Sequence, residues 1–198
     1  MDDSLQSDAA WAADIFRGSL VRLTAPRPDD AEILARWSED AGYRRRMDTD
    51  AARPLPPQHF QDRDEEPEPG AFEFRVRTLQ DERLVGFTAV FGIEWPNRHG
   101  WFSMGIGDPA DRGHGYGEEA LRLTLRFAFH ELGLHRVSLD VIAPNRPALE
   151  LYRKVGFQEE GRLRERLLRG GGAFDLLYMG LLAREWESKS APARAEPG

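Results

Sequence analysis

The chain of 198 residues contains no cysteine, and this absence excludes several kinds of chemistry. Without thiols there are no disulfide bonds, no covalent cysteine nucleophile and no thiolate ligands for a metal ion. The five histidines are scattered and include no pair spaced as His-x-x-x-His, so we expect no structural or catalytic metal. These absences leave reactions that need neither a cysteine intermediate nor a bound metal.

Long apolar runs are also missing. No segment approaches the ~18 consecutive apolar residues of a membrane-spanning helix. The first residues, Met-Asp-Asp-Ser, lack the basic and apolar regions of a signal peptide. We therefore predict no membrane association and a cytoplasmic location. The formal net charge of −7 argues against general nucleic-acid binding and is compatible with a cationic or amine substrate, although solubility explains the charge equally well.

The length and composition predict one globular domain with a sizeable core. Hydrophobic residues make up 40% of the chain and charged residues 31%, which is an ordinary balance for a soluble protein. We expect a polar N-terminal tail over residues 1–17, with a short helix near 11–16 as an alternative. A single domain is expected over 18–186 and a disordered C-terminal tail over 187–198.

Apolar spacing and turn residues predict an alternation of strands and helices. The expected strands cover residues 20–23, 72–77, 84–93, 100–107, 136–142, 157–168 and 174–182, and the expected helices cover 29–39, 116–132 and the stretch between Asn145 and Gly156. Asp29 and Glu32 form a capping-box pattern at the start of the first helix. Residues 40–70 show no long periodic segment beyond a possible short helix at 57–62, and we expect this region to form a wall of the substrate site.

A glycine-rich loop connects the strand at 100–107 to the helix that follows it. The sequence Arg112-Gly113-His114-Gly115-Tyr116-Gly117 precedes the helical stretch that begins at Glu118. Glycines at a helix N-terminus expose backbone N–H groups and favour a bound phosphate. The loop lacks the Gly-Lys-Ser/Thr ending of a Walker motif and the glycine spacing of a dinucleotide fingerprint. Taken alone, it fits a flexible turn as well as a pyrophosphate site.

A second group of residues favours the pyrophosphate site. Asn145, Tyr152 and Gly156-Phe157 follow the loop and the next strand, and this order resembles the GNAT superfamily of acetyl-coenzyme A-dependent N-acetyltransferases. The resemblance covers residues 85–185. Arg162 to Glu165, the glycine turn at 170–172 and Asp175 look like the bacterial branch that contains ribosomal-protein N-terminal acetyltransferases and spermidine acetyltransferases.

The resemblance implies an α/β (α+β) fold, with a mixed, twisted sheet of about seven strands and helices on both faces. The sheet would split between the strand ending near Gly107 and the one beginning near Arg136, and acetyl-CoA would lie in the split. The implied cofactor-binding residues are the strand backbone at Gly105, Ile106 and Gly107, the pyrophosphate loop Arg112, Gly113, His114, Gly115, Tyr116 and Gly117 with Glu118 at its edge, and Asn145 beside the pantetheine.

The sequence departs from the family pattern at His114 in the glycine loop and at the two glycines that flank Ile106. His114 stands where an arginine or lysine is more usual, which removes the expected side-chain contact to phosphate there. Gly105 and Gly107 flank Ile106 and weaken its strand preference, but they favour a bulge or a close approach to the backbone.

The resemblance also implies the chemistry. An uncharged amine attacks the thioester, so a base must remove a proton and an acid must protonate the thiolate. Tyr152 corresponds to that acid, and its alternative is a core aromatic packed beside Leu149. Glu94 is our choice of base because its strand is expected to end towards the cleft. The alternatives are Glu73, His99 and Ser103.

The predicted function is transfer of acetyl from acetyl-CoA to a primary amine, without a covalent acyl-enzyme. The acceptor could be a protein N-terminus, a polyamine or another small amine. A non-catalytic acyl-CoA-binding regulatory module is the alternative. The hairpin formed by 157–168 and 174–182 could also supply the surface of a homodimer.

Overall fold

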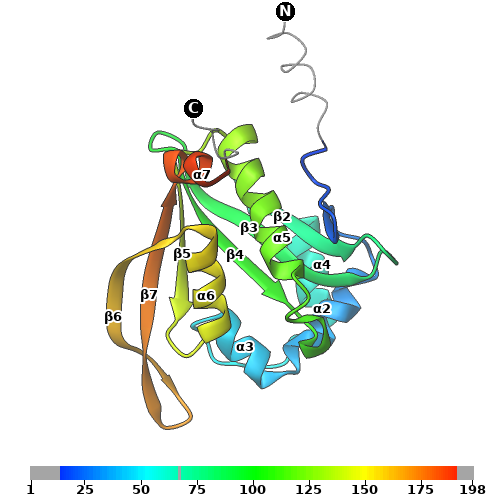
Figure 1. Cartoon of the computed structure of the whole chain (residues 1–198). Helices are drawn as coiled ribbons and strands as arrows, with labels where there is room; N and C mark the ends of the chain where they lie inside the picture. Colours follow the sequence, from blue (N-terminus) through cyan, green and yellow to red (C-terminus); the bar gives the residue numbers. More distant parts are fainter. Residues whose placement is uncertain (1–13, 67, 191–198) are drawn as a thin grey trace, which may run out of the picture.

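The computed structural model describes residues 14–66 and 68–190, and its centre is one sheet of seven strands (Figure 1). The strands lie in the order β1-β2-β3-β4-β5-β7-β6. Their bounds are β1 Val21–Thr24, β2 Phe72–Thr78, β3 Leu84–Glu94, β4 His99–Ile106, β5 Arg136–Ile142, β6 Gln158–Arg169 and β7 Gly172–Leu182. All neighbours are antiparallel except β4 and β5, which run parallel. The expected mixed, seven-stranded sheet is confirmed.

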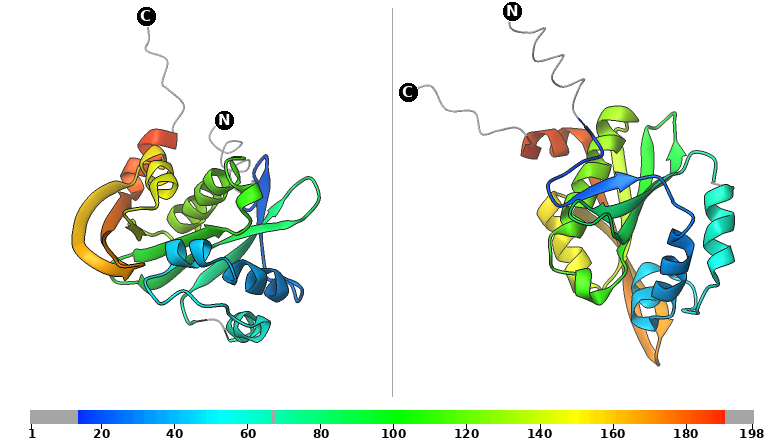
Figure 2. Two further views of the ribbon diagram at one scale, coloured as in Figure 1. Left: turned by 90° about the horizontal axis from the view of Figure 1, so that it is seen from below. Right: turned by 90° about the vertical axis from the view of Figure 1, so that its right-hand side faces the viewer.

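Helices cover both faces of this sheet (Figure 2). Their bounds are α2 Asp30–Ser38, α3 Ala41–Met47, α4 Pro57–Glu65, α5 Tyr116–Arg126, α6 Arg146–Val155 and α7 Ala183–Ser190, with a short 3₁₀ turn η1 at Pro109–Asp111 and a π-helical continuation of α5, η2, at Phe127–Glu131. The helices α5 and α6 pack on one face and α2, α3 and α4 lie on the other. Among the described residues, no helix is long and apolar enough to cross a membrane.

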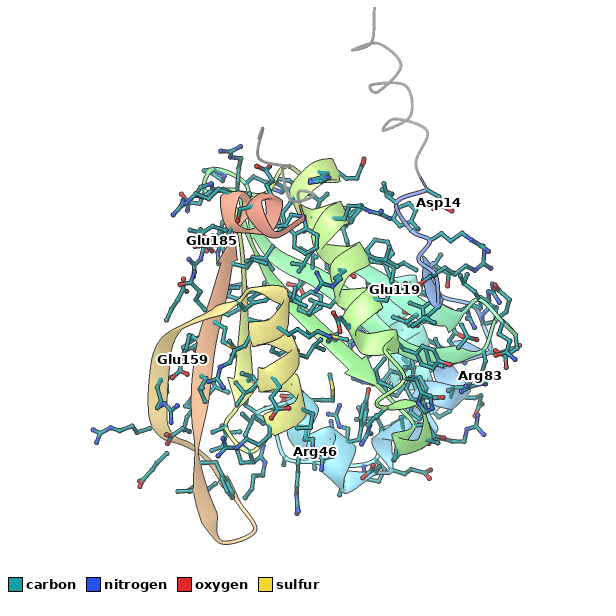
Figure 3. All side chains as sticks on the ribbon, in the orientation of Figure 1. Asp14, Arg46, Arg83, Glu119, Glu159 and Glu185 are labelled. Carbon is teal, nitrogen blue, oxygen red and sulfur yellow. The ribbon has the colours of Figure 1, made fainter. Side chains whose placement is uncertain are left out.

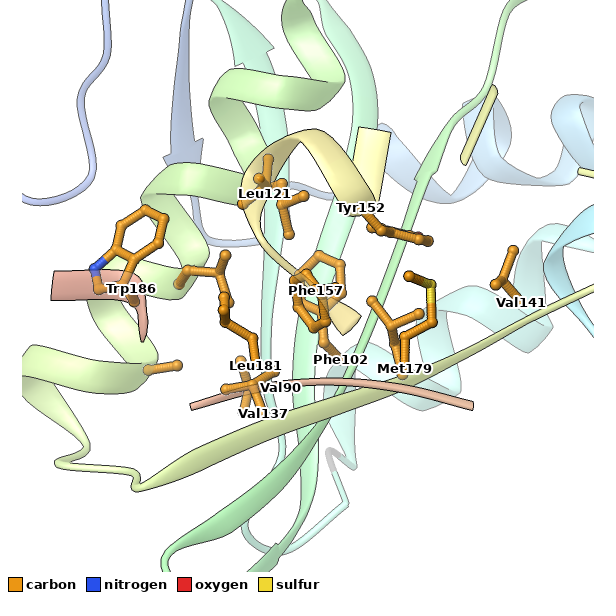
Figure 4. Packing of buried hydrophobic residues seen from close by; sticks show 14 of the residues in the cluster. Val90, Phe102, Leu121, Val137, Val141, Tyr152, Phe157, Met179, Leu181 and Trp186 are labelled. Atoms are coloured by element: carbon orange, nitrogen blue, oxygen red, sulfur yellow. The ribbon is translucent and has the colours of Figure 1, made fainter. Parts of the chain in front are cut away.

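Strand alternation decides which side chains face which helices. Val90 and Phe102 are cross-strand partners on β3 and β4, and they join the main core with residues of α5 and α6. Figure 4 shows Phe102, Tyr152 and Phe157 within this cluster. The next pair along the strands, Phe91 and Trp101, therefore faces the opposite side of the sheet. Thus β3 and β4 contribute side chains to the core on the α5 and α6 face and to the opposite face of the sheet.

The sheet splits between β4 and β5. The two strands pair only over His99–Trp101 and Arg136–Ser138. Beyond Trp101, β4 continues to Ile106 along β3, and β5 continues to Ile142 along β7. The facing edges of β4 and β5 are therefore unpaired over their second halves, at the position that the sequence predicted.

The helices between β1 and β2 differ most from the sequence prediction. The predicted short helix at 57–62 is found as α4 but extends to Glu65, and α3 had not been predicted. The Asp40 carboxylate caps α3 by accepting from the Gly42 N–H at 2.7 Å. Only Tyr43 of α3 is buried, so the helix has no periodic apolar stripe to signal it.

The first predicted helix, α2, begins without the expected capping box. Asp29 occupies the N-cap position but makes no capping hydrogen bond. The neighbouring Asp30 is buried instead, and its carboxylate accepts from the Arg27 N–H and from the Arg77 guanidinium. Tertiary contacts with β2 therefore replace the local cap.

Residues on both sides of the predicted domain, 18–186, also belong to the folded structure. Phe16 packs on Phe74 and Phe127, with ring centroids 5.6 and 6.0 Å away. At the other end, α7 continues to Ser190, four residues past the expected boundary. Residues 14–16 are not helical, and the remaining part of the predicted N-terminal helix, 11–13, lies outside the described residues, as does 191–198.

Candidate active site

A cleft of about 1390 Å³ occupies the split in the sheet and reaches both of its faces. Its walls on the α5 and α6 side include Gly113, Gly115, Gly117, Glu118, Asn145 and Tyr152. Its walls on the α3 and α4 side include Tyr43, Arg46, Met47, Asp48, Thr49 and Arg63. Figure 3 places the long side chain of Arg46 on α3, at the lower edge of the molecule. The cleft therefore joins the glycine loop to the region 41–71.

The glycine loop leads directly into α5, with Gly115 at the N-cap position. Gly113 and Gly115 have φ angles of +81° and +86°, which favour glycine, and Gly115 caps the helix without a side-chain hydrogen bond. The first N–H groups of a helix have no partner within it and attract anions. At Gly117 an added Cβ would lie 3.4 Å from Met104 and 3.5 Å from Ile106, which is ordinary contact. Protein packing therefore does not require glycine at 117, whereas a ligand close to the backbone would.

Two carboxylates of the first turn are engaged by neighbouring groups. Glu118 accepts from Lys154 at 2.5 Å and from Arg122 at 3.1 Å, and these bonds hold the pKa of Glu118 below its usual value. Glu119 accepts from the backbone N–H groups of residues 19–21 and from a hydroxyl. Burial alone would raise the pKa of Glu119, but these bonds lower it. Figure 3 shows Glu119 beside the N-terminal segment. The cations Lys154 and Arg122 offset the negative charge of Glu118, which would otherwise weaken anion binding at this helix end.

The free edge of β4 presents different residues from those expected. The Gly107 N–H donates to Val85 O at 3.1 Å and so points towards β3. Peptide groups alternate along an antiparallel pair, so those of Gly105 also face β3 while those of Met104 and Ile106 face the split. Of the three residues whose backbone was predicted to bind the cofactor, Gly105, Ile106 and Gly107, only Ile106 has peptide groups that face the cleft. Met104 was missed because its register became known only with the pairing.

Arg112 covers the end of this free edge. Its guanidinium donates to Gly107 O at 2.7 Å and to Ile106 O at 3.3 Å. The side chain lines the cleft but is held against the backbone of β4. Arg112 therefore connects the strand to the glycine loop.

Gly105 and Gly107 allow side chains from α2 and α3 to contact β4 closely. A Cβ at Gly105 would lie 2.7 Å from the Tyr43 hydroxyl, and one at Gly107 would overlap the Trp37 ring. The pairing of β3 with β4 shows no register shift from Phe102 to Ile106. Of the two predicted explanations for these glycines, close approach is the one observed.

His114 and Tyr116 lie outside the cleft lining. The His114 ring stacks on Tyr116 with centroids 5.7 Å apart, and its Nδ1 lies 3.1 Å from Arg112 O. His114 is exposed, and Tyr116 packs against the cluster beneath β1. Their side chains stabilise the loop, while Gly113, Gly115 and Gly117 line the cleft.

Tyr152 combines a packed ring with a hydroxyl at the cleft. The ring lies 5.8 Å from that of Phe157 and 6.5 Å from that of Phe102. Burial, assisted by the Asp140 carboxylate, raises the pKa of Tyr152 well above its usual value, so the hydroxyl keeps its proton at neutral pH. Within the described ranges, this hydroxyl makes no hydrogen bond. Asn145 begins α6 and lines the cleft, and its side chain does not cap the helix.

The expectation that Glu94 faces the cleft is wrong. Glu94 pairs with His99 at the closed end of the β3–β4 hairpin, because β3 runs away from the opening of the split. Its carboxylate is exposed and accepts from Asn97 at 2.8 Å, and this bond lowers the pKa of Glu94. Neither Glu94 nor His99 lines the cleft.

The other two alternatives, Glu73 and Ser103, do line the cleft. Glu73 forms ion pairs with Arg63, at 2.6 Å, and with the fully buried Arg75. Its carboxylate is therefore already engaged by two guanidinium groups. Ser103 offers a hydroxyl and needs another group to take its proton.

Asp140 is the carboxylate that the sequence interpretation missed. It lies on β5 opposite Tyr178, lines the cleft, and forms no ion pair with any residue in the described part of the chain. Asp140 is exposed to the cleft, and partial desolvation there raises its pKa. The Asp48 carboxylate raises it further, and Arg166 opposes the shift. The alternation of β5 did place this side chain opposite the core, but a charged residue there is usually solvated, and only the split makes it line a cleft.

No candidate metal site was found in residues 14–66 and 68–190, where no three or more His, Asp or Glu side chains form a metal-binding group.

Comparison with known proteins yields consistent matches. The family described as "Acetyltransferase (GNAT) domain" matches residues 21–158. The SPbeta prophage-derived uncharacterized N-acetyltransferase YokL of Bacillus subtilis is 31% identical over 116 residues, which cover 58% of this chain and 65% of that protein. The N-alpha-acetyltransferase RimI of Mycobacterium tuberculosis is 40% identical over 92 residues, covering 46% and 54%. The chain thus spans between half and two thirds of these relatives.

The fold is also shared with a solved structure. Spermidine N-acetyltransferase from Vibrio cholerae, in complex with CoA and spermine, superposes with a TM-score of 0.77 at 22% identity. The superposition covers 85% of this chain and 99% of that chain.

Proposed function

Because the chain belongs to the acetyltransferase (GNAT) domain family, we propose that it transfers acetyl from acetyl-CoA to a primary amine by direct attack. The observation that carries the proposal is the cleft through the split sheet, with a glycine loop on one face and a carboxylate, Asp140, on the other. The names of the relatives are those of N-acetyltransferases and give no support to the non-catalytic alternative.

The glycine loop fits the pyrophosphate of acetyl-CoA. The first N–H groups of α5 are free, Gly117 leaves room for a close ligand, and the first-turn carboxylate of Glu118 is neutralised by Lys154 and Arg122. The peptide groups of Met104 and the N–H of Ile106 would hydrogen-bond the pantetheine amides, while Ile106 O is held by Arg112 and Asn145 lies on the opposite wall. The bound V. cholerae enzyme supports coenzyme A as the ligand of this fold.

In the proposed reaction, Asp140 removes a proton from the ammonium group of the acceptor, directly or through water. The freed amine nitrogen attacks the thioester carbonyl, the new C–N bond forms, and the C–S bond breaks. Tyr152 gives its proton to the departing sulfur. The second proton leaves the new amide nitrogen and restores the Tyr152 hydroxyl, directly or through water, and the proton held by Asp140 returns to solvent. A raised carboxyl pKa suits the base, and a tyrosine protonated at neutral pH suits the acid.

We also propose limits for the catalytic domain and an assembly state. We retain 18–186 as the catalytic domain, with 14–17 and 187–190 as ordered extensions. The homodimer remains a prediction. Along the outer strand β6, most side chains are charged and exposed, which disfavours simple pairing of that edge with a second copy.

The experiment that tests the function is release of free coenzyme A from acetyl-CoA in the presence of a panel of primary amines. We expect amine-dependent release and a product heavier by one acetyl group in mass spectrometry. Binding of acetyl-CoA without turnover on any amine would contradict the proposal and revive the binding module.

A further inference from the structure

An arginine at the end of β6 connects two distant parts of the chain. Arg169 Nη2 donates to the backbone oxygens of Thr49 and Asp50, both at 2.5 Å, across 119 or more residues of sequence. Thr49 and the preceding Asp48 line the cleft just after α3. The β6–β7 hairpin thus contacts the loop that closes the α3 wall, and Figure 2 shows the hairpin tip reaching below that helix.

The loop after α3 and the β6–β7 hairpin are each also held by contacts of their own. On the loop side, the Asp48 carboxylate accepts from the Asp50 N–H at 2.9 Å and fixes the turn. On the hairpin side, Leu167 is buried against Ile142 and Leu176. The tight turn at Gly170 and Gly171, with φ angles of +57° and +81°, brings the chain back into β7. The contact therefore joins two formed segments.

The contact bridges the two walls of the acceptor half of the cleft. One wall is β5, with Asp140 and Ile142, and its neighbour β7 belongs to the hairpin. The other wall is α3 with Tyr43 and Met47. Between them lie the cross-strand partners Phe91 and Trp101, which also line the cleft. Arg169 therefore joins the two walls at the hairpin tip.

A polypeptide acceptor needs an exit for the chain that follows its reacting amine, whereas a small amine does not. We propose that Arg169 acts as a latch, which makes this enzyme selective for small free amines over the N-termini of polypeptides. The aromatic pair offers an apolar surface beside Asp140, so an amine with an apolar body suits the space. This inference rests on the proposed acetyl transfer.

The test compares two acceptors that share one reacting amine, phenylalaninamide and a hexapeptide that begins with phenylalanine. We expect the wild-type enzyme to show a kcat/KM for phenylalaninamide at least about 10-fold above that for the hexapeptide. Arg169→Ala should reduce this ratio to near 1 and leave the KM of acetyl-CoA unchanged. Arg169→Lys should keep much of the selectivity, since an ammonium group also donates to carbonyl oxygens.

The matched control is Arg164→Ala, a change of an exposed arginine on the same strand that should leave the ratio as in the wild type. If Arg169→Ala does not fold, Arg169→Met serves as the test, because it keeps an apolar stem and has no hydrogen-bond donor. Equal use of both acceptors by the wild type, or an unchanged ratio in a folded variant that removes the hydrogen-bond donor of Arg169, would overturn the latch. Absence of transfer to every amine would instead refute the proposed function, and the latch with it.

Discussion

The two halves of the cleft are built in different ways. The proposed cofactor half comes mainly from one stretch, Met104 to Glu118, and relies on backbone N–H groups and glycine conformations. The acceptor half comes from side chains on separate elements, among them Tyr43, Trp101 and Asp140. A backbone site depends on local sequence and can be recognised there. A site made of converging side chains exists only once distant segments are packed.

The acceptor half also depends on a buried charge network. Arg75 is fully buried and pairs with Asp64 at 2.6 Å and with Glu73, which connects β2 to α4. Asp30 pairs with Arg77 at 2.5 Å and connects β2 to α2. The helices of this half are therefore held partly by ion pairs, whereas α5 and α6 are held by the apolar core. The predictions below test this difference.

The largest effect is expected from Asp30→Ala. The change leaves Arg77 buried without its partner, which costs about 3–5 kcal/mol of the free energy of unfolding. Chemical denaturation measures the loss, and Asp29→Ala is the control because Asp29 makes no capping bond. Equal, small losses in both variants would mean that ion pairs do not hold the acceptor half.

Tyr152→Phe should lower kcat by roughly 10²-fold or more, since it removes the proposed acid and keeps the packed ring. The affinity for acetyl-CoA, measured by calorimetry, should change little. Wild-type turnover in the folded variant would leave Tyr152 as a core aromatic only.

Gly117→Val should weaken acetyl-CoA binding by roughly 10-fold or more, while the melting temperature changes much less. The reason is that an added Cβ makes only ordinary contacts with Met104 and Ile106, whereas the side chain would occupy the space in which the ligand approaches the backbone. Gly161→Ala is the control, with 3.9 Å between the added Cβ and Tyr178. Unchanged affinity in a folded variant would remove the loop from the cofactor site.

Asp48→Asn should shift the acid limb of the kcat/KM profile to lower pH. The charge of Asp48 adds to partial desolvation in raising the pKa of Asp140, and a base works only when deprotonated. Removing that charge lowers the pKa of Asp140 and preserves activity further into acid. Asp50→Asn is the control, and identical profiles for wild type and Asp48→Asn would argue against Asp140 as the base.

The smallest effect is expected from Glu94→Gln. Glu94 lies at the closed end of the hairpin, so steady-state rates should match the wild type within error. A loss of rate as large as that of Asp140→Asn would return Glu94 to the mechanism.

Most elements with a periodic pattern were predicted correctly, including β5 at Arg136–Ile142 and the terminal hairpin. The helix α3 was not, because a seven-residue helix with one buried side chain leaves no periodic trace. At the start of α2, the sequence favoured a cap by Asp29, but burial of the neighbouring Asp30 against Arg77 decided the structure.

By itself, the sequence determined the glycine loop and its connection to α5, because backbone conformation at Gly113 and Gly115 is a local property. It also indicated Tyr152, through a resemblance that extends along one continuous stretch. Only the tertiary structure decided that Glu94 points away from the cleft and that Asp140 lines it. Both are charged residues on strands, and strand pairing, together with the point where β4 and β5 part, determines which of them lines the cleft.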